Sequence, residues 1–249
     1  MRAPVILAAG LAALPIAAAA AGLPPQTADW SGQATLYAWL PVINGAQQGP
    51  DGQPLVDLQV NDVLSRLDMA FMGTFELRKE RFGLLFDAVY VDLSNDAQWL
   101  QNRVTVSTGT KVGMYTLAAA YRVYDEEKAA VDVYAGGRYF DTSLDFGIAT
   151  DRRGRTVSTD LSWSDAIVGL RGGVALTDHW SLRGFADVGG FDGSSDLSWQ
   201  IYGGANYAFN EHWGATLGYR YLSVLYQATD RATLDINIQG PLVGVTYRF

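Results

Sequence analysis

The sequence predicts an all-β protein, a closed antiparallel up-and-down β-barrel of about ten strands that spans a membrane, with eight or twelve strands as alternatives. Three observations lead to this prediction. Apolar residues alternate with small or polar ones in ten successive segments, which is the pattern of strands with two different faces. Short turns and long polar loops alternate along the chain, as at the two ends of a membrane barrel. Aromatic residues gather near both ends of the apolar stripes, where a barrel meets the two membrane interfaces.

The first 21 residues have the features of a secretory signal peptide, with Arg2 before an apolar run and Ala18-Ala19-Ala20 as a small-residue cleavage site. We expect residues 1–21 to be removed and residues 22–249 to form the barrel domain. A membrane anchor is the alternative for the apolar run, but the cleavage site favours a signal peptide. The next residues, 22–29, are expected to be a short flexible lead-in.

Ten segments have the strand pattern, and an apolar stripe runs along one face of each. They cover residues 30–40, 68–79, 82–93, 112–123, 131–143, 163–176, 180–190, 197–209, 213–225 and 234–249. The insert over 41–67 holds several turn signals and a short helix, expected at 61–67 with Asn61 or Asp62 as its N-cap. In the last segment the apolar residues are even-numbered before Gly240-Pro241 and odd-numbered after it. We therefore expect a β-bulge there, and a local break in the pairing with the first strand.

Two kinds of connection separate these strands. Short turns are expected at 80–81, 125–129, 177–179 and 210–212, and longer loops at 41–67, 94–107, 144–161, 190–196 and 226–232. Three short turns share the order acid, basic or imidazole residue, aromatic, small residue: Glu80-Arg81-Phe82-Gly83, Asp178-His179-Trp180-Ser181 and Glu211-His212-Trp213-Gly214. This is a weak internal repeat of hairpins. The even strand count places both ends of the barrel domain on the side of the short turns, which is expected to be the periplasmic side.

The charged residues of the strands are expected to face the lumen. A soluble secreted barrel would have the opposite arrangement, with its apolar stripes inside. The aromatic girdles favour a membrane barrel, and so does the choice of cation: Lys occurs only at positions 79, 111 and 128, and the other 15 cations are Arg, which is preferred for buried ion pairs. The predicted lumen network consists of Glu76, Arg78, Asp87, Arg122, Asp132, Arg138, Asp165, Arg171, Arg183, Asp187, Arg220 and Arg248. These seven Arg and five acids leave a cationic surplus of two.

Such a network can fill the lumen with ion pairs, or it can line a narrow, weakly anion-preferring pore. An eight-stranded barrel is filled by side chains, whereas a barrel of sixteen strands holds a channel, so ten strands favour a largely plugged lumen. On this interpretation, Arg138→Ala destabilises the barrel more than it changes the conductance.

The last strand, Leu242-Val-Gly-Val-Thr-Tyr-Arg-Phe249, resembles the C-terminal signature of bacterial outer-membrane β-barrel proteins, in which a terminal Phe follows a Gly and alternating apolar residues. Leu242 departs from the signature, which usually has a polar residue there. The segments Leu36–Pro41, Ala135–Tyr139, Asp187–Phe191 and Gly218–Leu222 are similar to those of a widespread group of uncharacterised Gram-negative outer-membrane proteins.

The resemblance implies export through the secretory pathway to the outer membrane, where lipid and lipopolysaccharide surround the barrel. It also implies that Gly244, Tyr247 and Phe249 form an assembly signal for the barrel-assembly machinery, reached with the help of periplasmic chaperones. The resemblance does not imply a particular activity.

Composition argues against several classes of function. The chain has no cysteine, so neither a disulfide framework nor a thiolate metal site is available, and its net charge of −8 argues against a nucleic-acid partner. We expect no cofactor and no metal ion, because the acidic residues of the loops lack the spacing of a dedicated calcium loop. The expected role is structural or binding, or that of a narrow small-solute pore, without enzymatic activity.

A surface enzyme of the outer membrane is the alternative. Omptin proteases also have ten strands and use Asp and His residues at the extracellular rim, and lipid A deacylases use a His–Ser pair at the outer leaflet. The histidines of this chain, His179 and His212, both lie in short turns at the opposite side, which disfavours such an enzyme because a general base must reach its substrate. The carboxylates expected near the outer rim, which form no catalytic pair by their spacing, are Asp92, Asp96, Asp145 and Asp160.

Overall fold

The computed structural model describes residues 23–47, 54–58, 60–99, 104–150, 153–191, 195–229 and 232–249. The predicted signal peptide, residues 1–21, lies outside these ranges. Most of the described chain is antiparallel β-sheet, as the sequence predicts.

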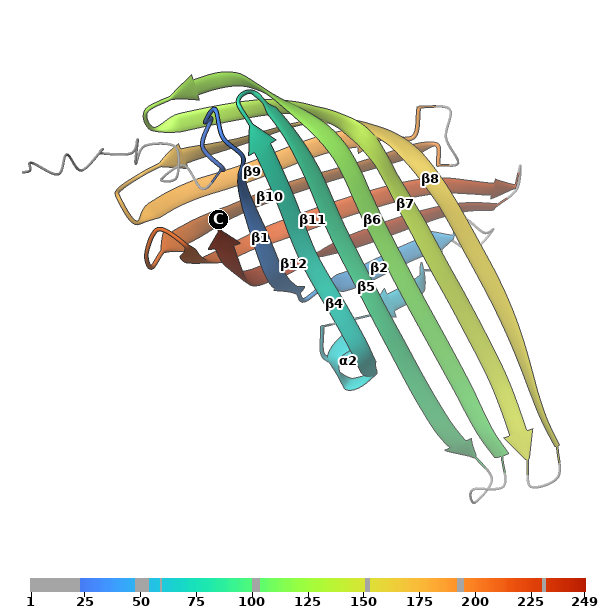
Figure 1. Cartoon of the computed structure of the whole chain (residues 1–249). Helices are drawn as coiled ribbons and strands as arrows, with labels where there is room; N and C mark the ends of the chain where they lie inside the picture. Colours follow the sequence, from blue (N-terminus) through green and yellow to red (C-terminus); the bar gives the residue numbers. More distant parts are fainter. Residues whose placement is uncertain are drawn as a thin grey trace, which may run out of the picture.

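Ten strands close into a barrel, which confirms the predicted fold class and strand number (Figure 1). In their order around the barrel they are β1 (Ser31–Trp39), β4 (Leu67–Lys79), β5 (Phe82–Trp99), β6 (Val104–Glu126), β7 (Ala129–Thr150), β8 (Arg153–Ala175), β9 (Trp180–Gly189), β10 (Leu197–Ala208), β11 (Trp213–Thr229) and β12 (Ala232–Arg248). Pairing of β1 with β12 closes the barrel from Gln33↔Arg248 to Trp39↔Leu242. A closed sheet leaves no strand edge over this stretch, which is what a barrel in lipid requires.

The insert between β1 and β4 contains β2 (Val42–Gln47), β3 (Pro54–Leu58) and the short helix α2 (Val60–Ser65). The helix confirms the position expected from the sequence, whereas the two strands were not predicted. β2 continues beyond β1 along the edge of β12, and β3 pairs with β2 as an outer strand. α2 buries Val63. Among the described residues, no helix is long and apolar enough to cross a membrane.

Three of the predicted long loops, 94–107, 144–161 and 226–232, are instead mostly strand. The β11–β12 hairpin stays paired as far as Thr229↔Ala232. The β5–β6 and β7–β8 hairpins stay paired as far as Trp99↔Val104 and Thr150↔Arg153. Ser, Thr and Val are frequent in these segments, and Thr and Val favour strands, but the regular apolar stripe of the other strands is missing. The expectation of loops was wrong because it took the loss of that stripe for a loss of strand.

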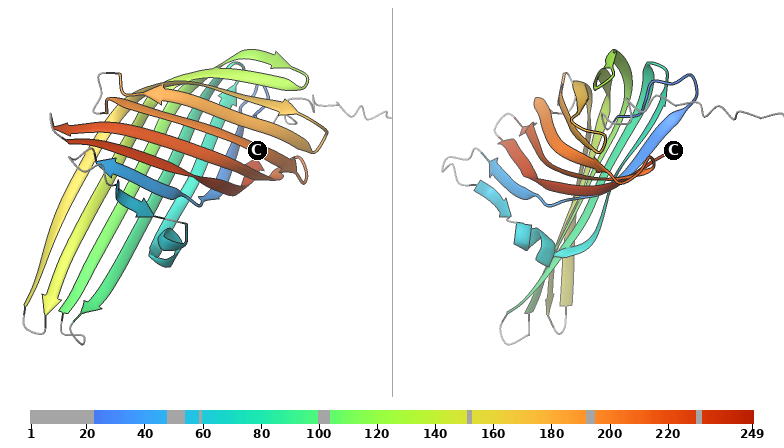
Figure 2. Two further views of the ribbon diagram at one scale, coloured as in Figure 1. Left: turned by 180° about the vertical axis from the view of Figure 1, so that it is seen from behind. Right: turned by 90° about the vertical axis from the view of Figure 1, so that its left-hand side faces the viewer.

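The barrel is closed where the short turns lie, called the turn end here, and divided at the opposite loop end. Pairing of β1 with β4 stops at Leu36↔Gly73, and pairing of β8 with β9 stops at Ile167↔Gly189. Beyond these two seams the sheet continues as two leaves, β4–β8 on one side and β9–β12 with β2 and β3 on the other, which diverge in the side view (Figure 2). The wall around the lumen is therefore complete only in the closed part.

The predicted bulge at Gly240-Pro241 is wrong. The register between β11 and β12 runs without interruption through Tyr219↔Pro241 and Arg220↔Gly240. The apolar pattern changes there because the lumen itself changes from polar to apolar, so that an even-numbered apolar residue such as Leu242 is buried inside. The break in pairing with the first strand is present: β1 ends and β2 begins opposite this point, where Leu40 N donates to Pro241 O at 2.9 Å.

Apolar side chains cover the outside of the closed part, and aromatic rings are concentrated at its turn end. Neighbouring strands bring these rings together as Phe82–Tyr121 (5.2 Å between centroids), Trp180–Tyr207 (4.9 Å) and Trp213–Tyr247 (4.9 Å). Phe75 of β4 and Phe249 after β12 stack at 6.0 Å across β1. Phe82 is 68% exposed and Phe249 53% exposed. The apolar stripes therefore point outward, as expected for a membrane barrel.

The short turns share a backbone contact as well as a sequence pattern. In each turn the carbonyl of the basic or imidazole residue accepts a hydrogen bond from the strand that follows the hairpin in the chain, near the end of that strand. The contacts are Arg122 N to Arg81 O (2.8 Å), Ala175 N to Lys128 O (2.7 Å), Ala208 N to His179 O (2.8 Å) and Arg248 N to His212 O (2.8 Å). Glu127-Lys128 thus extends the predicted repeat to a fourth turn, and the shared contact ties each hairpin to its neighbour.

Candidate functional site: the barrel lumen

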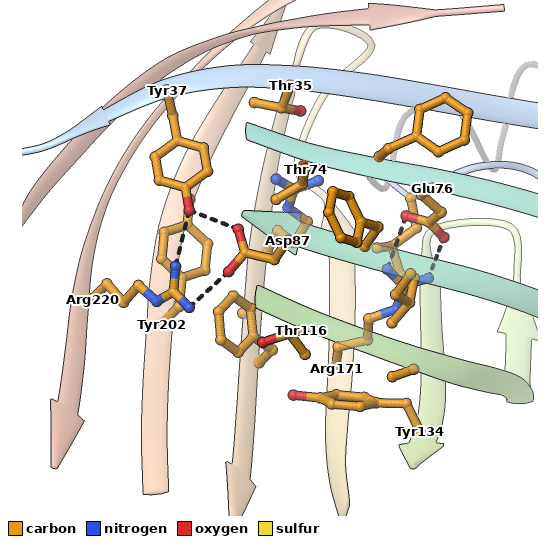
Figure 3. Close-up of a pocket in the computed structure, with 18 of the residues that line it drawn as sticks. Thr35, Tyr37, Thr74, Glu76, Asp87, Thr116, Tyr134, Arg171, Tyr202 and Arg220 are labelled. Atoms are coloured by element: carbon orange, nitrogen blue, oxygen red, sulfur yellow. Dashed lines mark hydrogen bonds and ion pairs between the residues drawn. The ribbon is translucent and has the colours of Figure 1, made fainter. Parts of the chain in front are cut away.

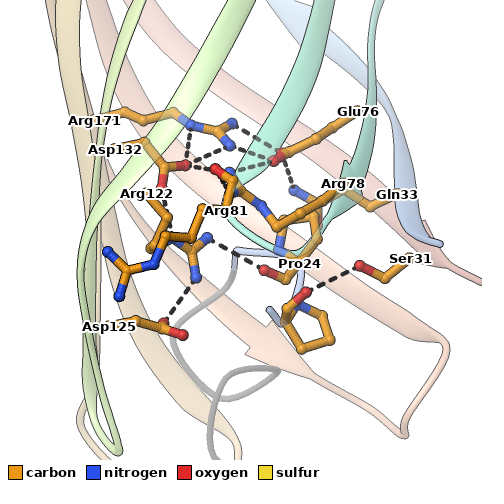
Figure 4. A network of polar contacts seen from close by, with 11 residues as sticks. Pro24, Ser31, Gln33, Glu76, Arg78, Arg81, Arg122, Asp125, Asp132 and Arg171 are labelled. Atoms are coloured by element: carbon orange, nitrogen blue, oxygen red, sulfur yellow. Dashed lines mark hydrogen bonds and ion pairs between the residues drawn. The ribbon is translucent and has the colours of Figure 1, made fainter. Parts of the chain in front are cut away.

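The turn end of the lumen holds a cluster of charged residues from β4, β6, β7 and β8 (Figure 4). Asp132 is its centre: its carboxylate accepts from Arg78 and Arg122 at 2.5 Å each and from Arg171 at 2.7 Å. Arg171 also binds both carboxylate oxygens of Glu76. The side chains of these five residues are at most 11% exposed. Such a cluster pairs most donors of three guanidinium groups in a space that excludes most water, although Arg78 Nε has no hydrogen-bond partner among the described residues.

The N-terminal segment closes this end of the lumen. Arg122 Nη2 donates to Pro24 O at 3.2 Å, and Leu23 is only 2% exposed. Ser31 Oγ donates to Pro25 O at 3.0 Å, and the backbone N–H of Glu80 donates to a carbonyl of the same segment, Thr27 O, at 2.8 Å. The expectation of a flexible lead-in is therefore wrong for residues 23–27, because the cluster supplies donors for their carbonyls.

A second ion pair, between Arg138 and Asp187, lies nearer the middle of the lumen. Arg138 Nη2 donates to both carboxylate oxygens of Asp187 at 2.9 and 3.0 Å. Tyr134 Oη (2.7 Å) and Gln200 Nε2 (2.6 Å) donate to the same carboxylate. All four donor contacts are buried, so the charge of Asp187 is fully compensated by its neighbours.

A third ion pair joins Arg220 to Asp87 at 2.9 Å (Figure 3). Tyr37 Oη donates to Asp87 at 2.6 Å, and Arg220 donates to Gln200 Oε1 at 2.7 Å. Gln200 therefore connects this pair to the carboxylate of Asp187. Arg220 also lies over the ring of Trp39, 5.1 Å from its centroid, a cation–π contact that joins the polar and apolar parts of the lumen.

A cavity of about 130 Å³ lies between the turn-end cluster and these two pairs. Its polar lining includes Thr35, Thr74, Thr116, Gln33 and Tyr202, and Leu23 reaches it from the N-terminal segment (Figure 3). A water molecule occupies roughly 30 Å³ in the liquid, so the cavity has room for a few waters or a very small solute.

An apolar layer crosses the lumen above the ion pairs, towards the loop end. Trp163 stacks on Phe140 at 4.7 Å between ring centroids, and it packs against the tilted ring of Tyr226 at 5.2 Å. The buried members of the same layer are Tyr37, Trp39, Met72, Val89, Met114, Phe140, Trp163, Tyr202, Leu222, Val224 and Leu242. The sequence prediction missed this layer, although Trp163 lies two positions from Asp165 and thus on the same strand face.

All twelve residues of the predicted lumen network lie on lumen-facing positions, and nine of them form three ion-paired groups rather than one ladder. Asp165 belongs to none of the three: it accepts from Ser195, which follows β9, through both its backbone N–H and its hydroxyl. The last two predicted members, Arg183 and Arg248, lie near each other on β9 and β12. The tyrosine and glutamine partners of the ion pairs were not predicted as site residues, although alternation placed Tyr37, Tyr134 and Gln200 on the polar face.

The residues considered for a surface enzyme do not come together. His179 and His212 are exposed at the turn end, and His179 Nδ1 lies 3.0 Å from Ala208 O. Three rim carboxylates are bound separately: Asp92 by Lys111 (3.9 Å), Asp145 by Ser158 (2.5 Å) and Asp160 by Ser143 (2.6 Å). The side chain of Asp96 lies outside the described part of the structure. Within that part, His, Asp and Glu form no group of three that could hold a metal ion.

The known proteins that resemble this chain do so in structure. No protein-family model matches the chain, and no curated protein matches it. The outer membrane protease OmpT from Escherichia coli superposes with a TM-score of 0.57 and 10% sequence identity, over 90% of this chain and 98% of OmpT. The fold is that of an outer-membrane β-barrel. Structures with lower scores include the outer-membrane protein OprG from Pseudomonas aeruginosa (TM-score 0.37, 9% identity, 90% and 97% covered) and Ail, the attachment invasion locus protein of Yersinia pestis, with a heparin analogue (0.38, 12%, 88% and 98%).

At 10% identity the match to OmpT concerns the architecture of the barrel and not its chemistry. In outer-membrane barrels the short turns face the periplasm and the long connections face the outside. By this general rule, the turn end of this barrel is expected on the periplasmic side and the two leaves of the loop end on the extracellular side.

Proposed function

We propose that this outer-membrane barrel has a structural or binding role and does not form an open pore. The observation that supports this proposal most directly is the aromatic layer around Trp163, which crosses the lumen on the extracellular side of the ion pairs. The turn-end cluster and the N-terminal segment close the periplasmic side. A solute would have to break buried ion pairs, at a cost of about 3–5 kcal/mol for each, and then displace tightly packed rings.

The two extracellular leaves are the proposed site of binding. The β5–β6 and β7–β8 hairpins extend far beyond the seam at Ile167↔Gly189 and offer a large sheet outside the closed barrel. Catalysis is not part of the proposal. Both histidines lie at the opposite end, and the described rim carboxylates are separated and bound to hydroxyls or to Lys111.

We further propose that the chain reaches the outer membrane by secretory export, periplasmic chaperones and the barrel-assembly machinery, with Gly244, Tyr247 and Phe249 as the assembly signal. There it would be surrounded by lipid and lipopolysaccharide. The exposed apolar exterior and the aromatic girdle at the turn end support this location.

Planar-bilayer recording on the refolded protein tests the closed lumen. We expect no stable single-channel steps from the natural sequence. The double variant Phe140→Ala with Trp163→Ala removes two stacked rings and is expected to raise the leak. Val168→Ala, on the outer face of the same strand, is the matched control and is expected to remain silent. Regular single-channel steps from the unaltered protein would contradict the proposal.

A further inference from the structure

We propose that the free edge of β8, from Thr156 to Ser164, binds an extended peptide with alternating basic and apolar residues, which adds to the sheet as an antiparallel strand. This binding rests on the role proposed above for the extracellular leaves and names the kind of partner. Pairing of β8 with β9 stops at Ile167↔Gly189, whereas β8 stays paired with β7 as far as Thr150↔Arg153. β8 therefore forms the border of its leaf (Figure 2).

The strand register shows which backbone groups this edge presents. Ala175 N–H donates to Lys128 O, so the odd-numbered residues of β8 direct their backbone N–H and C=O groups towards β7. On the other side, Ala166 O accepts from Gly190 N–H, as expected for an even-numbered residue. The β7–β8 register runs without a shift, so the even-numbered groups farther along point to the free edge. They belong to Thr156, Ser158, Asp160, Ser162 and Ser164. Within the described part of the structure, no other strand hydrogen-bonds to them.

This edge lacks the features that usually protect the border of a sheet. Natural edge strands are kept short or carry Lys, Pro or a β-bulge. The outer strand β3 follows this rule, since it has five residues and begins with Pro54. Residues 156–164 of β8 contain neither Lys nor Pro, and their pairing with β7 has no bulge. An unprotected row of N–H and C=O groups is the template on which an extended peptide adds as a further strand.

The outer face beside the edge favours a basic partner. Asp160 on the edge strand is exposed, and Asp141 and Asp145 lie beside it on β7, on the same face of the sheet. In the same row, Lys111 lies two strands away from Asp160, on β6, and contacts Asp92 of β5 at 3.9 Å. Lysines on the outer face of an added strand would therefore meet carboxylates. A second copy of this edge would present the same carboxylates to each other, which disfavours it as the occupant.

The inner face of the edge favours apolar side chains. The odd-numbered residues lie on this face: Trp163 is buried in the apolar layer, and Leu161 packs against that layer. Val157, farther along the same face, is 52% exposed. Apolar side chains of an added strand would pack beside these residues. Because side chains alternate between the two faces of a strand, a peptide that suits both faces alternates basic and apolar residues.

Fluorescence anisotropy of a labelled peptide of alternating Lys and Val tests the edge, with the refolded protein in a nonionic detergent. We expect one saturable binding event. In the antiparallel pair, the lysines lie opposite the even-numbered residues of β8, so the backbone N–H groups of the lysines face β8. N-methylation of the lysine residues is therefore expected to abolish binding. N-methylation of the valine residues is the matched control and should leave the affinity within about threefold.

Two substitutions on β8 test the protein side. Ser162→Pro removes an N–H from the free edge and leaves the pairing with β7 intact, since that N–H points away from β7. We expect it to weaken peptide binding at least about tenfold, whereas Ser162→Ala, which keeps the N–H, should stay within about twofold. Asp160→Asn is expected to weaken binding about threefold, and Glu211→Gln, in an exposed turn at the opposite end, should not change it.

The outcomes separate strand addition from general attraction between charges. No saturable binding to the unaltered protein, equal affinities of the two methylated peptides, or equal affinities of Ser162→Pro and Ser162→Ala would overturn the proposed peptide site. Each variant is first checked for the gel shift of a folded barrel, which migrates faster before heating. If Ser162→Pro does not fold, the two methylated peptides decide on the unaltered protein.

Two further results would also count against the peptide. A dimer in sedimentation of the detergent-solubilised protein that is lost in Ser162→Pro would assign the edge to a second copy and overturn the peptide as its occupant. Absent peptide binding together with a silent bilayer recording would overturn the peptide site alone and leave the closed lumen of the proposed function intact.

Discussion

Asp132 is the carboxylate that binds the most arginines in the lumen: three guanidinium groups contact it, and its side chain is fully buried. We expect Asp132→Asn to lower the free energy of unfolding by about 3–5 kcal/mol, since the neutral amide leaves three buried guanidinium groups short of a counter-charge. Urea unfolding of the refolded barrel, followed by tryptophan fluorescence, measures this change.

Asp92→Asn is the matched control for Asp132→Asn. It removes the same charge from an ion pair with Lys111 that is 3.9 Å long and largely exposed on the lysine side. Exposed pairs of this kind contribute less than about 1 kcal/mol. Equal effects of the two substitutions would mean that the turn-end cluster is not buried in solution.

Single residues also show how far sequence reasoning reaches. Alternation placed all twelve charged residues on the lumen face, because a strand shows successive side chains to opposite sides. It could not assign their partners. Arg122 does bind its cross-strand neighbour Asp132, whereas Arg138 lies opposite Asp165 in the register but binds Asp187, two strands away. Long side chains cross a narrow lumen, so the partner depends on the closure of the whole barrel.

Among the elements, the N-terminal segment 23–27 has a role that its sequence did not suggest. Its apolar residue and its carbonyls fit a mouth lined by Arg122 and the first turn, a match that exists only in the closed barrel. A deletion of residues 23–27 is expected to admit solutes to the central cavity. Because the chain has no cysteine, Thr74→Cys in the cavity wall gives one specific reporter.

Labelling of that cysteine by a hydrophilic maleimide measures the opening. We expect the rate to rise at least about tenfold after the deletion, since a thiol in the cavity wall that becomes more hydrated also ionises more readily. Glu211→Cys, in an exposed turn, is the control and should react at the same rate with and without the segment. Fast labelling of Thr74→Cys in the undeleted protein would show that the segment does not close the lumen.

The last strand combines closure of the barrel with the proposed assembly signal. Phe249 stacks on Phe75, and its backbone exchanges two hydrogen bonds with Gly32 at 3.0 Å. We expect Phe249→Ala to cost about 1 kcal/mol of stability after refolding in detergent, the value of one aromatic pair. In cells we expect a several-fold lower yield of folded barrel, measured by the gel shift of outer-membrane fractions. Phe82→Ala, which removes another girdle ring, should match it in stability and leave the cellular yield unchanged; equal yields for both variants would argue against a signal at Phe249.

At the scale of the whole molecule, the closed part of the barrel could be predicted and its loop end could not. Ten strands, the outward apolar face and the short helix at 60–65 follow from periodicity and turn signals. The apolar layer at Trp163 was not predicted, because a strand with apolar residues on both faces shows no alternation between apolar and polar residues. The long hairpins were not predicted for the opposite reason: a strand with polar residues on both faces has a sequence pattern like that of a loop.

The two seams also have a consequence for the membrane around the barrel. Backbone groups must be paired inside hydrocarbon, so lipid can reach only as far as each seam allows. Pairing of β1 with β4 covers six residue pairs, and pairing of β8 with β9 covers nine. At about 3.3 Å per residue and a tilt of about 40°, these correspond to heights of roughly 15 Å and roughly 23 Å. The bilayer beside β4 must therefore be thinner than the bilayer beside β8. The lipid around the barrel accordingly varies in thickness from one side to the other.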